Sequence, residues 1–122
     1  MSGTHKDLEV WQAAMHLAVQ VYRLTAVFPK DERYGLTSQM RRAAVSVASN
    51  IAEGKGRSSD KELIQFLCNS RGSLFEIETQ LTIGERLAYS TPEDCNAVRR
   101  EIARIGQMLN GLMRSVRPRP TA

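Results

Sequence analysis

Apolar side chains that recur every three or four residues run through most of the chain, and they constrain its fold more than any other feature. Residues 7–28 contain neither glycine nor proline and carry two such rows. The first row is Leu8, Trp11, Met15, Ala18, Tyr22 and Thr25, and the second is Val10, Ala14, Leu17, Val21, Leu24 and Phe28. The spacing is that of an α-helix, and two rows are wider than one packing surface needs. The sequence therefore predicts a helix over Asp7–Phe28 that packs on two sides.

The same spacing predicts three further helices. The second is expected over Thr37–Glu53, and the third runs from Ser59 toward Tyr89, where Ser59 and Glu62 fit a capping box. The fourth begins at Pro92, with Thr91 as its N-cap, and continues to Val116. No segment alternates with period two, so no strand is expected.

Short links between long helices make neighbouring helices antiparallel. The sequence therefore predicts an all-α fold, an antiparallel up-and-down four-helix bundle over residues 1–116. Residues 117–122 are expected to form a flexible basic C-terminal tail, because Pro118 and Pro120 forbid a helix there.

Length and composition narrow the class of protein. A chain of 122 residues is expected to form one domain, and it has no apolar run of the ~20 residues that cross a bilayer. Its first residues lack the pattern of a signal peptide. Cys68 and Cys95 lie far apart with no histidine nearby, which favours free thiols over a zinc site or a disulfide. We therefore expect a cytoplasmic protein with no membrane segment, metal or cofactor.

The stretch SNIAEGKGRSSDKE, residues 49–62, raises the question of a phosphate-binding loop. It has neither the glycine spacing nor the preceding strand of the nucleotide-binding loops. We interpret it as a corner between two helices, in which a left-handed Gly54 ends one helix and Ser59 starts the next. An anion at the start of the third helix, beside Lys55 and Arg57, remains the alternative.

A polar row marks the second helix at helical spacing, and Arg42 in this row is expected to reach Asn69, Ser73 or Glu76 of the third helix. The row consists of Arg42, Ser46, Asn50 and Glu53. One interpretation is an active-site seam with Glu76 as acid or base. The favoured one is a hydrogen-bonded network that sets helix register, since buried polar groups need partners. Gly72, in the middle of the third helix, suggests a close contact there. No nucleophile–histidine relay and no small-molecule substrate can be identified, so the chain is not expected to be an enzyme.

Positive charge is concentrated at the C-terminal end. Residues 1–94 hold 11 Lys and Arg against 12 Asp and Glu, whereas residues 95–122 hold six arginines against Glu101 alone. The six are Arg99, Arg100, Arg104, Arg114, Arg117 and Arg119. They are candidate contacts for RNA or DNA. Residues 95–122 contain no aromatic side chain, which favours contact with the phosphate backbone over stacking on bases.

Three blocks of the sequence resemble a known family. They are LEVWQAAMHLAVQVYRLTAVFP, RYGLTSQMRRAAVSVASNIAEGKGR and ELIQFLCNSRGSLFEIETQL, within residues 7–89. The chain resembles the four-helix bundle protein family, the bacterial 23S rRNA-intervening-sequence proteins. The resemblance implies an up-and-down bundle that assembles into a ring-like pentamer, and it assigns no catalytic residue.

Two functions follow as hypotheses. The first is a non-enzymatic homo-oligomer, a pentamer by the resemblance, that binds nucleic acid or a nucleoprotein partner through its basic end. The second is a protein-interaction or structural oligomer with no nucleic-acid role. In either case the second apolar row of the first helix is expected to seal the contact between subunits, through Val10, Ala14, Leu17, Val21 and Leu24.

Overall fold

The computed structural model describes residues 3–116 as four long helices and two short 3-10 helices, with no strand in this range. In chain order they are η1 (His5–Asp7), α1 (Glu9–Thr25), η2 (Lys30–Glu32), α2 (Leu36–Lys55), α3 (Asp60–Arg86) and α4 (Pro92–Val116). The all-α prediction is therefore confirmed. None of the helices in the described range is both long enough and apolar enough to cross a membrane.

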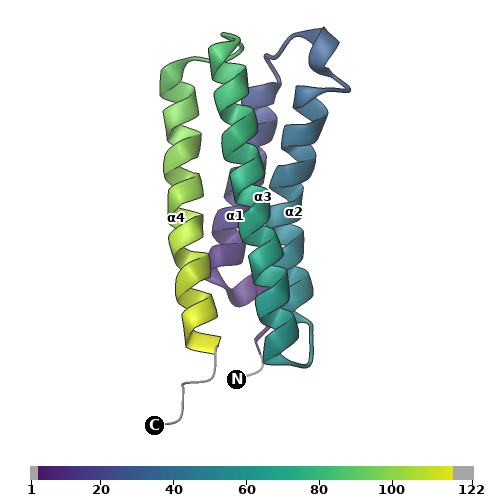
Figure 1. Ribbon diagram of the computed structural model, residues 1–122, viewed down its shortest axis with the longest axis vertical. Coiled ribbons are helices and arrows are strands. Elements are labelled where there is room, and N and C mark those ends of the chain that lie inside the picture. The colour runs from purple at the N-terminus through teal and green to yellow at the C-terminus, as the bar shows by residue number, and fades with distance from the viewer. Residues whose placement is uncertain (1–2, 117–122) are drawn as a thin grey trace.

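The four long helices stand side by side and alternate in direction, as Figure 1 shows. α1 packs against α2 and α4, and α3 packs against the same two helices from the other side. α2 and α3 pack against each other most extensively. Within residues 3–116 the diagonal pairs, α1 with α3 and α2 with α4, make no close backbone contact. The result is the predicted antiparallel up-and-down bundle, with the α2–α3 turn and the last turn of α4 at the same end (Figure 1).

The core lies between the four helices and takes one apolar row from each. The α1 row is the one expected to face another subunit: Val10, Ala14, Leu17, Val21 and Leu24 are all at most 8% exposed. They pack with α2, α3 and α4 side chains in one hydrophobic cluster. The prediction that these five residues form the subunit interface is therefore wrong. The side of α1 left partly exposed carries the other row, with Met15 at 41% and Tyr22 at 45%.

The glycine corner is a turn between two helices, but Gly54 acts differently from the prediction. It lies inside α2, and no glycine in the described range has a positive φ angle. α2 ends instead at Lys55, and the residue that caps it, Gly56, has right-handed geometry. A Cβ at Gly54 would lie 2.9 Å from Cβ of Phe66 and 3.1 Å from Cδ1 of Leu63 on α3. Glycine at this position therefore lets α3 approach α2 closely.

Side chains cap the next two helices as predicted. The Ser59 hydroxyl accepts a hydrogen bond from the backbone N–H of Glu62 and donates one to its carboxylate, both at 3.1 Å. Thr91 accepts from the backbone N–H of Asp94 at 3.2 Å and so caps α4. These bonds satisfy N–H groups that have no partner within the helix.

The third helix ends earlier than predicted. Its last residue is Arg86, and Ala88 then adopts a left-handed conformation with φ of 61°. The backbone N–H groups of Ala88 and Tyr89 bond to the carbonyls of Glu85 and Gly84, both at 2.9 Å. This is a Schellman ending with alanine where glycine is usual, which is why the sequence shows no stop signal.

Substitution of Gly54 tests the close approach of α2 and α3. Gly54→Ala is expected to lower the free energy of unfolding by about 1–2 kcal/mol, because the new methyl group meets the base of the Phe66 side chain. Gly72→Ala is the matched control, since no atom lies within 4 Å of a Cβ there. It is expected to stabilise α3 by about 0.5–1 kcal/mol through helix propensity. Urea denaturation measures both, and equal effects at the two sites would contradict the steric explanation.

Candidate nucleic-acid interface

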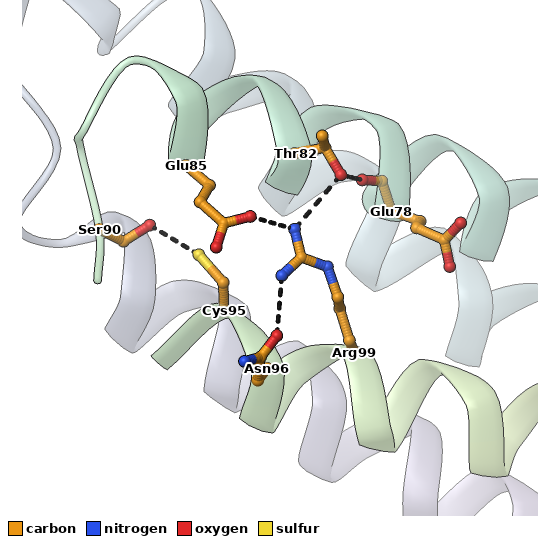
Figure 2. A network of polar contacts seen from close by, with 7 residues as sticks. All are labelled: Glu78, Thr82, Glu85, Ser90, Cys95, Asn96 and Arg99. Atoms are coloured by element: carbon orange, nitrogen blue, oxygen red, sulfur yellow. Dashed lines mark hydrogen bonds and ion pairs between the residues drawn. The ribbon is translucent and has the colours of Figure 1, made fainter. Parts of the chain in front are cut away.

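The side chain of Arg99 links α4 to α3, as Figure 2 shows. Its guanidinium forms an ion pair with Glu85 and donates hydrogen bonds to Thr82 Oγ1 at 3.4 Å and Asn96 Oδ1 at 3.0 Å. The hydrogen bond from Arg99 holds the pKa of Glu85 below its usual value, and the same bond raises the pKa of Arg99. These bonds engage the guanidinium within the chain, which removes Arg99 from the predicted set of nucleic-acid contacts.

The other predicted arginines within the described range point outward. Arg104 pairs with Glu101 one turn earlier on α4 at 3.1 Å, and its side chain remains 59% exposed. Arg100 and Arg114 are exposed, and neither has a hydrogen-bond or ion-pair partner among residues 3–116. Arg117 and Arg119, with the rest of the predicted tail over residues 117–122, lie outside the described residues.

Arg71 of α3 joins these arginines, although the sequence analysis did not select it. Its Nη1 donates a hydrogen bond of 3.0 Å to Oδ1 of Asn110 on α4. Arg71, Asn110, Met113 and Arg114 together line an open hollow of about 290 Å³ between the two helices. The structure thus brings an arginine from each helix to one depression.

The polar row of α2 is a network only in its middle part. The hydroxyls of Ser46 and Ser73 lie 2.9 Å apart, and Asn50 Nδ2 donates to the Ser46 hydroxyl at 2.9 Å and to its carbonyl at 2.8 Å. Glu53, at the end of the row, accepts instead from Arg57 on the corner at 3.0 Å. A buried bond from the hydroxyl of Ser70 to the carbonyl of Val47, at 2.8 Å, adds to the link between α2 and α3.

Arg42 and Glu76 lie outside that network. Both line a hollow of about 330 Å³ on the α2–α3 face, together with Gln39, Ala43, Ser46 and Gln80. Neither charged side chain has a hydrogen-bond or ion-pair partner within residues 3–116. Gln80 Oε1 is buried there and accepts no hydrogen bond. Ser73, one of the expected partners of Arg42, bonds instead to Ser46, and Arg42 shares the hollow with Glu76.

α1 and α2 carry several exposed apolar side chains. Tyr22 and Val45, 45% and 44% exposed, line one open hollow with Arg41, Arg42, Ser46 and Ser49. Arg41 Nε donates to Thr25 Oγ1 at 2.9 Å, and its guanidinium lies 4.6 Å from the centre of the Tyr22 ring. Met15 and Val19, on α1, are exposed to a similar extent. Arg41 therefore holds the tyrosine in place on a surface that is otherwise open.

The titratable groups of the common catalytic relays are dispersed. His5 packs edge-on against Trp11 at 5.0 Å, and His16 is exposed on α1. Cys68 contacts the sulfur of Met113 at 3.7 Å, and Cys95 is buried beside Ser90. Both thiols are free. Within the described range, no three His, Cys, Asp or Glu side chains are placed to hold a metal ion.

The Arg99–Glu85 pair predicts a pH-dependent stability. Because the pKa of Glu85 is lowered in the folded protein, the pair stabilises the fold above the ordinary carboxylate pKa. This stabilisation is lost as the pH falls through the lowered value. Arg99→Gln is therefore expected to reduce the free energy of unfolding more at pH 7 than at pH 3.

Arg104→Gln, which breaks an exposed pair within one helix, is the matched control and should have a smaller effect at pH 7. Urea denaturation at the two pH values measures both variants. Equal losses for Arg99→Gln at pH 3 and pH 7 would contradict the assigned role.

Comparison with known proteins gives one family and a matching fold. The family described as 23S rRNA-intervening sequence protein matches residues 6–111. A similar solved structure is a protein of unknown function from the S23 ribosomal protein family of Bacteroides thetaiotaomicron VPI-5482. It is 21% identical, the alignment covers 86% of this chain and 95% of that one, and the TM-score is 0.80, which shows a shared fold. Among curated proteins, none matches. Because the family match spans most of its length, this chain belongs to the 23S rRNA-intervening sequence protein family.

Proposed function

We propose that the chain is a non-enzymatic, homo-oligomeric bundle that binds nucleic acid through phosphate contacts on the outer surface of α3 and α4. The observation that carries the proposal is the exposure of Arg100 and Arg114, neither of which has a hydrogen-bond or ion-pair partner among residues 3–116. Arginines that pair with carboxylates of their own chain, such as Arg99, have little left to offer a phosphate. Unpaired arginines on one side of a bundle are what backbone contact requires.

The distribution of carboxylates supports this surface. Neither residues 63–75 of α3 nor residues 102–116 of α4 contain an aspartate or glutamate. These two segments face each other across the helix pair, as the bond from Arg71 to Asn110 shows. A polyanion meets less repulsion over such a region than elsewhere on the molecule.

Phosphate contacts alone bind without choosing a sequence. Residues 95–122 carry no aromatic side chain on which a base would stack. We therefore propose binding that is strongly dependent on salt and weakly dependent on sequence. RNA and DNA are both candidate ligands, and the family description favours RNA.

The second part of the proposal is self-association, through a different surface from the one that the sequence predicted. The predicted residues of α1 fill the core, so we assign the subunit contact to exposed apolar side chains of α1 and α2, which are Met15, Val19, Tyr22 and Val45. The resemblance to the family adds the expectation that the oligomer is a five-fold ring. A ring repeats the α3–α4 surface once per subunit, so individually weak contacts combine into a higher affinity.

The alternative function is a protein-interaction oligomer, and the hollow on the α2–α3 face favours it. Arg42 and Glu76 offer a partner a cation and an anion within one depression. A polar protein surface satisfies such a mixture better than a polyanion does, because Glu76 repels phosphate.

Fluorescence anisotropy with labelled RNA and DNA over a range of salt tests the nucleic-acid proposal. Arg100→Gln/Arg114→Gln is expected to reduce the slope of log K against log salt by about 1.8 on a duplex, or about 1.4 on a single strand, for each engaged subunit. The control is Arg23→Gln/Arg33→Gln, which removes the same charge from exposed positions outside α3 and α4. Absence of binding by the unmodified protein would leave the protein-interaction alternative.

Light scattering at micromolar concentration tests self-association. The unmodified protein is expected to be an oligomer, and Met15→Glu and Val45→Glu are each expected to shift it toward the monomer, because a buried unpaired carboxylate is costly in an interface. Val27→Glu is the control, since Val27 is 74% exposed in the α1–α2 connection and is not one of the proposed contact residues. A monomeric unmodified protein would refute the oligomer.

A further inference from the structure

Two contacts between side chains of α3 and α4 border the hollow. Cys68 Sγ contacts Met113 Sδ at 3.7 Å, and one turn along α3 the Arg71 guanidinium bonds to Asn110 at 3.0 Å. Met113 is 4% exposed and belongs to the core, so the hollow has an apolar floor. Arg71 and Arg114 therefore stand on a rigid surface that packing already orders.

The polar side chains of this hollow offer mainly N–H donors, because the acceptor oxygen of Asn110 is already bonded to Arg71. Arg71 uses Nη1 on Asn110, which leaves its other N–H groups available. Asn110 accepts through Oδ1, so its amide N–H groups also remain to donate. Arg114 has no hydrogen-bond or ion-pair partner within residues 3–116. A ligand that fits this set must supply acceptor atoms and negative charge.

No carboxylate competes for these donors. None lines the hollow, and the facing segments of α3 and α4 contain none. In this respect the hollow differs from the other end of the same helix pair, where Arg99 forms an ion pair with the carboxylate of Glu85 (Figure 2). It differs in the same way from the hollow of Arg42, which Glu76 shares.

The shape of the ligand follows from the placement of the donors. Two guanidinium groups reach the hollow from different helices, and an amide stands beside one of them. A tetrahedral oxyanion presents several oxygens in different directions and can accept from all three groups. No aromatic side chain lines the hollow, so a base gains no stacking partner there.

We propose that Arg71, Asn110 and Arg114 form a binding site for one phosphate group of a nucleic-acid backbone. This inference rests on the proposed function and makes it specific, because it names the groups that receive the phosphate and includes an arginine and an asparagine that the sequence analysis did not select. Asn110 is a positioning residue as well as a donor, since its bond holds the Arg71 guanidinium over the hollow. A donor held in place loses little conformational entropy on binding.

A matched pair of substitutions tests the site. Asn110→Asp keeps the acceptor for Arg71 and places a negative charge where the phosphate is proposed to bind. It is expected to weaken nucleic-acid binding at least about tenfold at low salt, and to reduce the salt slope by about 0.9 on a duplex or about 0.7 on a single strand for each engaged subunit. Gln39→Glu is the control, because Gln39 is exposed on α2 and lies outside the α3–α4 hollow.

The control variant has the same net charge as Asn110→Asp and should bind nearly as the unmodified protein does. Arg71→Gln should act as Asn110→Asp does, and circular dichroism verifies that all variants are folded. Equal affinities and equal salt slopes for Asn110→Asp and Gln39→Glu would overturn the site while leaving binding through other arginines intact.

A second measurement separates the site from the proposed function. In the full chain labelled with ¹⁵N, titration with inorganic phosphate at constant ionic strength is expected to shift the side-chain signals of Arg71, Asn110 and Arg114. Chloride at the same ionic strength should not shift them. If phosphate shifts these signals and neither RNA nor DNA binds, the proposed function fails and the anion site stands. If phosphate leaves all three signals unchanged, the site is refuted even when nucleic acid binds.

Discussion

The close approach of α2 and α3 is the constraint on which the rest of the bundle depends. Gly54 permits it sterically, and the bond from the Ser70 hydroxyl to the carbonyl of Val47 links the two helices through buried polar groups. A hydroxyl that donates to the backbone of a neighbouring helix requires a short distance between the two helices and a fixed register. With α2 and α3 locked in this way, α1 and α4 each complete the core by packing one apolar row against the pair.

The helices could be predicted from the sequence, whereas the contacts between them could not. Apolar spacing and caps such as Ser59 are local properties, so four helices follow from them. The same spacing does not say which of two rows on α1 faces the bundle, and the row with Leu17 was therefore misplaced at an interface. The left-handed Ala88 was missed for a related reason. Alanine has no preference for this conformation, which accompanies backbone hydrogen bonds that the sequence does not reveal.

The candidate site shows the same division. The number of arginines indicated the C-terminal helix as the candidate interface. Whether an arginine is free to bind a ligand, however, depends on which side chain lies opposite it on the neighbouring helix. Arg99 meets Glu85 across the helix pair, and Arg71 meets Asn110, which is 39 residues away in sequence. The sequence did contain a signal for this contact. Counting a similar number of residues in both directions from the turn between α3 and α4 places Arg71 near Asn110. The absence of carboxylates from both segments then marks them as a pair.

The even number of antiparallel helices has a consequence for any cyclic assembly of this chain. The α2–α3 turn and the last turn of α4 share one end of the bundle, and the α1–α2 and α3–α4 connections share the other (Figure 1). Cyclic symmetry keeps every copy pointing the same way along the axis. Such a ring has two chemically different rims, and Arg114, in the last turn of α4, belongs to only one of them. A polyanion that contacts both Arg114 and Arg100 would therefore lie along the outer surface of a subunit, from one rim toward the other, and a fusion to either end of the four-helix unit would emerge at the rim that carries Arg114.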